Sequence, residues 1–479
     1  MGYRALPAIV VLALTTSVLA GQTPAQHPAE EAFAAAVDEA RLRRAVRELV
    51  ALGPRMGGTP SNDASADYLA DYFRGIGLDV EVFEDPPKLA HWEDSWRVEL
   101  EDGSVLASAW PMGFSPSVPE PRSGQLLVVD NLTQATPTAQ WRGRVIYTPG
   151  DVASAYAAVV KSGHLPLAIL SSAPNDPPRY LDWSRITELP ARADHPFPAF
   201  NVSYVDGRTL ASAAETGRSV RVSLVSQVRE GRPKTVVATL PGREADQYYL
   251  VCAHGDSDSG GPGADDNASG VSTVMEIARV YAALVESKQI PVPRYSLRFA
   301  IWGSEYHSSH AYIEREGERL RNVQAVINFD ETGTGAERDA IYFESNEVPW
   351  NENLLRTFER VAGDYAKRHG FWTEYTTNPS QGGTDSYAFL PRQYKGKAYT
   401  SLQIPATTIY TAAWDKLAEL PQTPGWESPG TPDPKNLKID YSLYYHSSGD
   451  TPENTTEREP HNMVKAVKVT GLVLLRLNR

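Results

Sequence analysis

From residue 235 onward, apolar strand-like runs alternate with amphipathic helical stretches, and this alternation constrains the fold more than any other feature of the sequence. Strands are predicted at YYLVCA, Ser296–Ile301 and Val323–Asp330, with helices over Val271–Val285 and from His310 onward. Strands that alternate with helices of about 10 to 15 residues form a mainly parallel sheet. The sequence therefore predicts the α/β class, with a mainly parallel mixed sheet sandwiched by helices.

The first residues are typical of a secretory signal peptide. Arg4 supplies one positive charge, and Leu6–Ala20 is almost wholly apolar and ends in small residues. This apolar run is shorter than the roughly 20 residues that span a bilayer, which favours cleavage over anchoring. We expect residues 1–20 to be removed and the mature protein to be secreted or periplasmic. No later segment predicts a membrane span.

Between the signal peptide and residue 235 the pattern of polar and apolar residues changes twice. Residues 21–30 are polar and predict a linker, whereas amphipathic spacing predicts helices and a strand over residues 31–91, the N-terminal part of the main domain. Residues 92–235 carry short β-rich runs and two helical stretches, and we interpret them as an inserted smaller α/β domain. Residues 236–479 complete the main domain.

Composition excludes several kinds of partner and site. Lys and Arg total 46 against 59 Asp and Glu, a net charge of −13, so a nucleic-acid partner is not expected. Cys252 is the single cysteine, which excludes an internal disulfide and thiolate-rich metal sites. Any metal must therefore be held by nitrogen and oxygen. The sequence predicts no particular oligomeric state.

Candidate metal ligands gather where predicted strands end, and ligands of open α/β sheets bind beyond the carboxyl ends of the strands. A single His there is an ordinary polar residue, and Asp before a helix can be an N-cap. Capping needs only one such residue, however, and here adjacent carboxylates follow a His-x-Asp triplet whose Asp can orient the imidazole. The residues concerned are His254, Asp256, Asp265, Asp266, Glu305, Asp330, Glu331 and His446.

These segments resemble, in order, the motifs of the co-catalytic zinc exopeptidases, the family of bacterial leucyl aminopeptidase, glutamate carboxypeptidase and carboxypeptidase Q, with glutaminyl cyclase as a relative. The likeness covers most of the chain, and residues 120–228 resemble the protease-associated domain often inserted in this family. The matching motifs are His254–Ser257, Gly263–Gly270, Trp302–Glu305, Asn328–Asp330 and Tyr445–Thr451.

The resemblance implies two zinc ions held by oxygen and nitrogen donors. Asp265 is expected to bridge the ions, His254 and Asp330 to complete one site, and His446 to hold the other. A bridging carboxylate keeps two cations about 4 Å apart, and each cation lowers the pKa of the water between them.

The resemblance also implies roles for three further residues. Glu305 is expected to be the general base that takes a proton from the metal-bridging water and delivers it to the leaving amine. Asp256 is expected to orient His254. Asp266 is expected to follow a strained peptide bond from Asp265, for which the cis form is an option.

The sequence departs from the family pattern directly after Glu305. Members usually carry Glu-Glu there, and the second Glu holds the metal shared with the late His, but this chain has Tyr306. Three outcomes stay open. His307, or Tyr306 as phenolate, substitutes as a ligand; the His446 site stays weak or empty and one zinc binds; or Glu305 becomes a ligand and leaves no base.

Two further acidic residues have open roles. Three roles are open for Glu331, which follows Asp330. It can hydrogen-bond to the metal ligands, it can lie in solvent, or it can bind the ammonium group of a substrate. Asp385 lies in Gly382–Tyr387, which is similar to a Ser-Asp-His stretch of the family with the His absent. A place in the pocket and a turn role are equally compatible with this pattern.

The expected function is that of a secreted zinc-dependent aminopeptidase that hydrolyses N-terminal residues of peptides. The segment Gly263–Gly270 resembles the aminopeptidase branch more closely than the carboxypeptidase branch. The alternatives are a carboxypeptidase, a glutaminyl cyclase-like enzyme, and a catalytically weakened peptidase fold that serves as a binding protein. Because Tyr306 replaces the second Glu and one expected ligand is lost, the sequence also allows a binding protein without catalytic activity.

Overall fold

The computed structural model describes residues 28–172, 181–257, 260–333, 340–345, 349–369, 374–379, 384–389, 393–394, 397–398, 402–411, 444–458 and 461–479. The predicted signal peptide lies outside these residues. Of the predicted linker 21–30, the described part is already helical from Pro28, which corrects the expected linker boundary.

The main domain is built on an eight-stranded mixed sheet. Its central strands run parallel, with β10 paired to both β11 and β12, and β12 paired to β17. Antiparallel pairs join β1 to β9, β9 to β11 and β13 to β17, while β13 and β14 are parallel. The predicted α/β class and mainly parallel mixed sheet are confirmed. In spatial order the strands are β1 (Asp79–Glu84), β9 (Lys234–Leu240), β11 (Tyr295–Trp302), β10 (Glu244–His254), β12 (Val323–Phe329), β17 (Ala406–Tyr410), β13 (Ala340–Ser345) and β14 (Glu374–Pro379).

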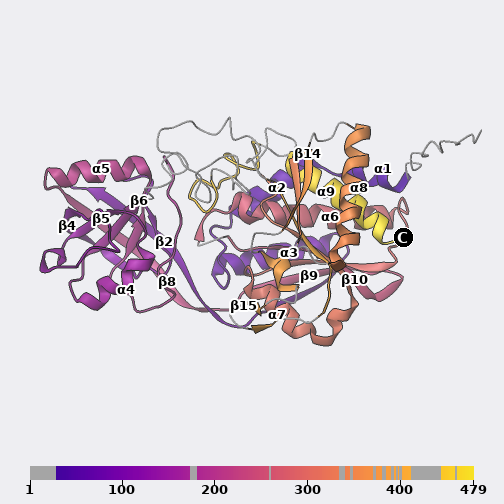
Figure 1. The fold of residues 1–479 in the computed structure, drawn as a ribbon, viewed down its shortest axis with the longest axis horizontal. Coiled ribbons are helices and arrows are strands. Elements are labelled where there is room, and N and C mark those ends of the chain that lie inside the picture. Colours follow the sequence, from indigo (N-terminus) through magenta and orange to yellow (C-terminus); the bar gives the residue numbers. More distant parts are fainter. Residues whose placement is uncertain are drawn as a thin grey trace, which may run out of the picture.

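Both faces of this sheet are covered, so its central strands are apolar on both sides. Along β10, Tyr249 and Val251 join the core that the larger helical layer covers, while Leu250 and Cys252 join the core on the opposite face. Figure 1 shows the helices around the main sheet. They are α1 (Pro28–Ala36), α2 (Glu39–Val50), α3 (Pro60–Gly75), α6 (Gly270–Glu286), α7 (His307–Glu316), α8 (Glu352–His369) and α9 (His461–Leu477).

A second lobe contains a seven-stranded sheet with its own apolar clusters, seen at the left of Figure 1. Two long antiparallel strands, β2 and β8, pair from Lys88 with Gly231 to Leu100 with Val220, with one shift of register between Glu93 and Ser95. They enter and leave the lobe side by side. The strands in spatial order are β2 (Lys88–Leu100), β8 (Ser219–Gly231), β4 (Val118–Val128), β5 (Val145–Pro149), β6 (Ala168–Ser172), β7 (Ala199–Asn201) and β3 (Trp110–Pro111), with helices α4 (Ala153–Ser162) and α5 (Tyr204–Glu215).

Short elements complete the described chain. A hairpin pairs β15 (Gln393–Tyr394) with β16 (Lys397–Ala398). The irregular helical turn η3 (Ala264–Ser269) leads directly into α6, and the 3-10 turn η6 (Asp385–Phe389) contacts β12 and β17. The other 3-10 turns are η1 (Ala139–Trp141), η4 (Gly317–Asn322) and η5 (Pro349–Asn351).

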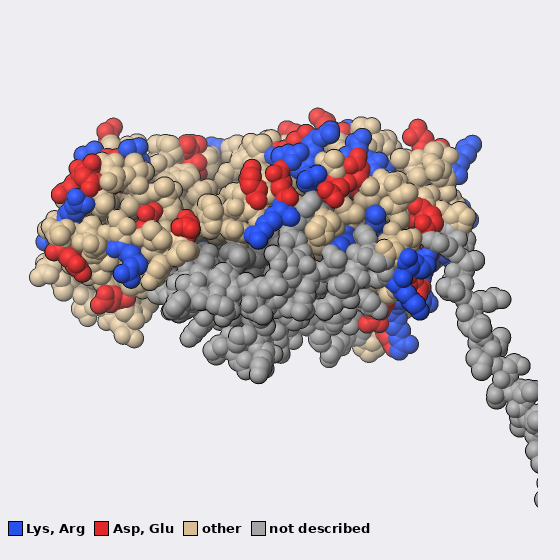
Figure 2. Space-filling model, turned by 90° about the horizontal axis from the view of Figure 1, so that it is seen from above, with Lys and Arg blue, Asp and Glu red and all other residues tan. Residues whose placement is uncertain are grey.

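One stretch among the described residues, Ala264–Glu286, is long and apolar enough to cross a membrane by length and composition alone, and most of it is buried inside the protein. Buried apolar helices of this length are common in the cores of globular domains. Figure 2 shows a face of the molecule on which acidic and basic side chains are interspersed among the described residues. On that face the described Lys and Arg side chains do not form one continuous basic field.

Candidate metal and catalytic centre

The candidate site lies where three neighbouring strands of the main sheet end. His254 is the last residue of β10, Glu305 follows β11 after two intervening residues, and Asp330 directly follows β12. Because these strands are parallel neighbours, their carboxyl ends lie at the same edge of the sheet. The sheet topology therefore brings together three side chains that are up to 76 residues apart in sequence.

His254 is the centre of the most compact group of donors. Its Nε2 lies 3.3 Å from Asp266 Oδ1 and 3.3 Å from Asp330 Oδ1. Its Nδ1 lies 3.2 Å from Asp256 Oδ1, which is the orienting contact expected for Asp256. Burial lowers the pKa of His254, but Asp330, Asp256 and Asp266 outweigh it and raise that pKa well above its usual value. The donor atoms of His254, Asp266 and Asp330 all lie within 4.8 Å of one another, close enough to hold one ion.

Asp266 also contacts the second histidine, with Oδ2 3.0 Å from His446 Nε2. Its carboxylate therefore lies between His254 and His446, the place expected for Asp265. Burial alone would raise the pKa of Asp266, but hydrogen bonds from the two histidines lower it below its usual value. The cis peptide bond is Asp266–Asn267, one bond later than the one expected.

Asp265, which the sequence predicted as the bridging residue, has a different surrounding. Its Oδ1 accepts a hydrogen bond from Gly333 N at 2.8 Å, on the loop after β12. The reason is local: η3 departs from helical geometry at Asp266, with φ −107° and ψ 90°, so consecutive side chains leave the backbone in different directions. Asp266 is the residue that faces His254.

Two buried residues that the sequence prediction missed hold this turn in place. Asp450 accepts from Asp265 N at 2.8 Å and from Asp266 N at 3.1 Å. Arg55 donates from Nη2 to Gly263 O at 2.8 Å and from Nε to Gly255 O at 3.2 Å. Burial lowers the pKa of Arg55 to about 10, against the opposing effect of Asp450 and two other carboxylates. Asp450 belongs to a recognised motif, whereas nothing around Arg55 in the sequence indicated its role.

Glu305 is joined to the His254 group through Asp256, because Glu305 N donates to Asp256 Oδ1 at 2.9 Å. Burial raises the pKa of Glu305 well above its usual value. Asp330, Asp385 and Asp266 raise it further, while His254 lowers it. A raised pKa makes a carboxylate a better proton acceptor, which suits general acid and base chemistry.

The two residues after Glu305 differ in orientation. Tyr306, with φ 53°, donates from its backbone N to Asp385 Oδ1 at 2.9 Å. Burial raises the pKa of the Tyr306 phenol, as do Glu305 and Asp385, which opposes a phenolate ligand. His307 instead lies with Nε2 2.8 Å from Pro86 O, in an exposed contact. This contact does not support His307 as a substitute ligand.

Asp385 and Glu331 both lie within the acidic surroundings of the site. Asp385 starts η6, and burial raises its pKa to about 7. The neighbouring Thr384 Oγ1 donates to Asp330 Oδ2, so this turn supports a candidate ligand. The pKa of Glu331 is raised well above its usual value by burial and then by Asp266 and other carboxylates. The companion residues Gly382 and Gly383 lie outside the described residues.

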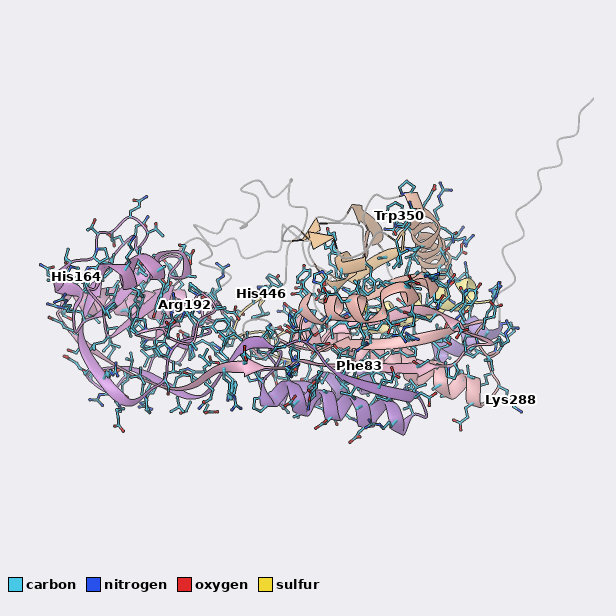
Figure 3. The ribbon with its side chains drawn as sticks, turned by 90° about the horizontal axis from the view of Figure 1, so that it is seen from below. Phe83, His164, Arg192, Lys288, Trp350 and His446 are labelled. Carbon is cyan, nitrogen blue, oxygen red and sulfur yellow. The ribbon has the colours of Figure 1, made fainter. Side chains whose placement is uncertain are left out.

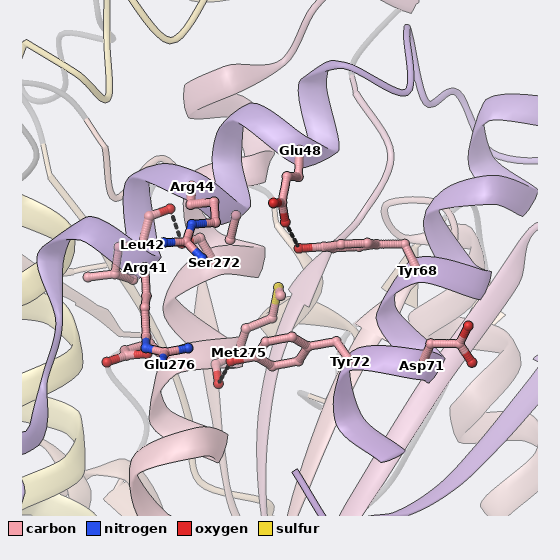
Figure 4. Close-up of a pocket in the computed structure, with 11 residues that line it drawn as sticks. Arg41, Leu42, Arg44, Glu48, Tyr68, Asp71, Tyr72, Ser272, Met275 and Glu276 are labelled. Atoms are coloured by element: carbon pink, nitrogen blue, oxygen red, sulfur yellow. Dashed lines mark hydrogen bonds between the residues drawn. The ribbon is translucent and has the colours of Figure 1, made fainter. Parts of the chain in front are cut away.

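A separate hollow of about 390 Å³ lies between α2, α3 and α6. Figure 4 shows its lining, where Tyr68 OH donates to Glu48 Oε2 at 2.8 Å and Arg41 and Glu276 lie at one end. None of its lining residues belongs to the group around His254. The hollow is therefore separate from the candidate metal centre.

Comparison with known protein families identifies a match over the second half of the chain. Residues 235–470 match the sequence model described as Peptidase family M28. Leucine aminopeptidase 2 of Arthroderma otae is 26% identical over 269 residues, which are 54% of this chain and 48% of that protein. The chain thus matches about half the length of this relative. Aminopeptidase YwaD of Bacillus subtilis is 26% identical over 361 residues, 70% of each protein.

A solved structure supports the fold independently. The zinc aminopeptidase BSAP from Bacillus subtilis superposes with a TM-score of 0.58 at 19% sequence identity. The superposition covers 90% of this chain and 94% of that one, so the likeness extends over both lobes.

Proposed function

The chain belongs to peptidase family M28 through residues 235–470, and on this premise we propose that it is a zinc-dependent aminopeptidase that removes N-terminal residues from peptides. One observation carries the proposal. The carboxylate of Asp266 lies 3.3 Å from His254 Nε2 on one side and 3.0 Å from His446 Nε2 on the other. This is the donor arrangement that two neighbouring cations require.

The donors fit zinc, which accepts imidazole and carboxylate ligands at roughly 2.0–2.2 Å. His254, Asp266 and Asp330 would hold the first ion, and Asp266 and His446 would hold a second, weaker one. Cys252 is fully buried in the core and takes no part. When bound, zinc lowers the pKa of a coordinated water and polarises the scissile carbonyl. Tyr306, where the family has its ligand, is the reason for the weaker second site.

Glu305 would serve as general base and then as general acid. Its raised pKa suits a group that takes a proton from the attacking water and gives it to the leaving amine. Asp256 connects the candidate ligand His254 with the candidate base Glu305, because its Oδ1 contacts His254 Nδ1 and also accepts a hydrogen bond from Glu305 N. With its backbone fixed in this way, Glu305 stays a base rather than shifting into the ligand set.

Charge in the site favours an aminopeptidase over a carboxypeptidase. The described site residues are mostly carboxylates, which attract an N-terminal ammonium rather than a C-terminal carboxylate. Arg55 is the buried arginine beside them, and its guanidinium donates to the carbonyl oxygens of Gly255, Pro262, Gly263 and Leu49. We assign the ammonium to Glu331, which directly follows the candidate ligand Asp330.

The proposal is tested by zinc content and turnover together. After dialysis, the purified protein should retain zinc and hydrolyse aminoacyl anilides, but not the same substrates with an acetylated amine. Glu305→Gln should keep the zinc and lose nearly all turnover, while Glu318→Gln, at a side chain that is 91% exposed, should match the wild type. Absence of zinc would contradict the metal assignment. If the wild type bound zinc but showed no turnover, the alternative of a binding protein without catalytic activity would be favoured.

We also propose that the protein is exported by its apolar leader. Leu6–Ala20 follows Arg4 and ends in small residues, as signal peptides do. The mature protein should therefore begin soon after Ala20, which mass spectrometry of material secreted by an expression host can check. Recovery of the intact N-terminus in a membrane fraction would contradict cleavage.

A further inference from the structure

A loop of the inserted lobe, residues 181–189, pairs with the loop that carries His446. Ile186 N donates to His446 O at 2.8 Å, and Ser448 N donates to Ser184 O at 2.9 Å. The residues between these two pairs form an antiparallel bridge. Figure 3 shows His446 at the junction of the two lobes. The backbone of His446 is thus held by a segment that lies more than 250 residues earlier in the chain.

Side chains fit the two loops closely together. Ser184 N donates to Ser448 Oγ at 3.0 Å, and the rings of Trp183 and Tyr444 lie 6.1 Å apart. Gly449 lies against the indole, where an added Cβ would come within 2.7 Å of Trp183 Cγ. A larger residue than glycine would therefore push the two loops apart.

The same loop of the inserted lobe is fastened to β2 by a buried histidine. His91 Nδ1 lies 3.0 Å from Glu93 Oε1, and Nε2 lies 3.2 Å from Glu188 Oε1. The ring is 1% exposed and packs edge-on against Phe114 at 4.6 Å. Burial alone would lower the pKa of His91, but the bonds to Glu188 and Glu93 raise it to about 9, so the ring is cationic at neutral pH.

A backbone pair next to Glu188 strengthens this attachment. Leu189 N donates to Gly113 O, and Gly113 N donates to Thr187 O, each at 2.9 Å. Gly113 lies so close to the ring that an added Cβ would come within 2.2 Å of His91 Nε2. The loop is therefore tied at one end to the strand that joins the lobes and at the other to His446.

We propose that loop 181–189 sets the position of His446, with Glu188 and His91 as positioning residues, so that the inserted lobe determines the affinity for the second zinc. The inference rests on the proposed function for the identity of the ion. His446 is on a loop, has φ 49°, and its side chain is 31% exposed. Because Tyr306 stands where the resemblance implies a carboxylate ligand, binding of the second zinc depends strongly on the position of the His446 imidazole.

The test compares zinc affinity in three variants of the full-length protein. Glu188→Ala removes one partner of His91, and Trp183→Ala removes the contact with Gly449. Both substitutions should lower the affinity for the second zinc by about 10- to 100-fold, the usual effect of removing a residue that supports a metal ligand. The affinity for the first zinc should stay the same. The matched control is Asp194→Ala, which removes an exposed ion pair with Arg192 near the same loop.

Hydrogen exchange of the zinc-free protein gives a readout that does not depend on the metal. Glu188→Ala should speed exchange of the amides of Ile186 and Ser448, which pair across the two loops, and Asp194→Ala should not. Unchanged exchange and unchanged second-zinc affinity in both test variants would overturn the inference. A wild type that binds no zinc would overturn the proposed function instead, and the exchange result alone would then decide the role of the loop.

Discussion

The two halves of the candidate site are built in different ways. The His254 half rests on neighbouring parallel strands, has three donors within 4.8 Å, and has a histidine side chain that is only 4% exposed. In the His446 half, Asp266 lies 3.0 Å from a histidine that is on a loop and has a side chain that is 31% exposed. One half is therefore fixed by the core of the main domain, and the other by contacts between lobes.

This difference indicates how the same fold can carry a strong and an adjustable metal site. Strands packed on both faces cannot shift without disturbing a close-packed core. A loop that is held by backbone hydrogen bonds to another lobe can shift by breaking a few of them. We therefore expect perturbations to affect the His446 half first and to leave the His254 half intact.

The largest effect should come from the residue that belongs to both halves. Asp266→Asn removes the charge of the carboxylate between His254 and His446 and should abolish binding of both ions, together with turnover. Asp265→Asn should retain both ions, because Asp265 Oδ1 accepts a backbone hydrogen bond, and should lose no more than about 10- to 100-fold in activity. Zinc content by atomic absorption checks both. The opposite ranking would restore Asp265 as the bridge.

The next prediction separates the halves. His254→Ala should remove all tightly bound zinc, since the three-donor group loses its central nitrogen. His446→Ala should leave one zinc per chain and reduced turnover, because Asp266 and Asp330 remain with His254. Titration with a chromogenic chelator distinguishes one ion from two. Complete loss of zinc in both variants would contradict the independence of the halves.

A gain of affinity should follow when the missing carboxylate is restored. Tyr306→Glu places an anionic oxygen donor where the resemblance to the zinc exopeptidases implies a carboxylate ligand, and we expect the second zinc to bind about 10- to 100-fold more tightly. Tyr306→Phe, which removes only the hydroxyl, should leave that affinity unchanged if the phenol is not a ligand. Weaker binding in Tyr306→Phe would show that the phenol coordinates.

Part of the His254 half could be grouped from the sequence because its geometry follows from strand order. Residues at the ends of parallel neighbours meet at one sheet edge, so His254, Glu305 and Asp330 could be grouped from pattern alone. The choice between Asp265 and Asp266 could not be made in this way. Two adjacent side chains on an irregular turn differ in direction by an amount that only the backbone angles of that turn define.

The supporting residues were less predictable because their contacts are mostly with backbone atoms of distant segments. Arg55 donates to carbonyl oxygens about 200 residues away, and no residue type at those positions signals the contact. His307 has the right chemistry for a ligand but begins α7 facing Pro86. The pairing of loop 181–189 with the His446 loop is likewise a contact between backbones.

The smallest predicted effect concerns pH and acts on the His446 half alone. The pKa of His91 is raised from 6.5 to about 9, so its ion pairs with Glu93 and Glu188 stabilise the folded state fully below pH 6.5 and lose that contribution as pH rises through about 9. Amide exchange of residues 444–450, corrected for the intrinsic rise with pH, should therefore increase across this range. His91→Gln should abolish the increase, while His164→Gln, elsewhere in the inserted lobe, should preserve it. If His91→Gln showed the same pH profile as the wild type, the charge of His91 would have no part in holding the His446 loop.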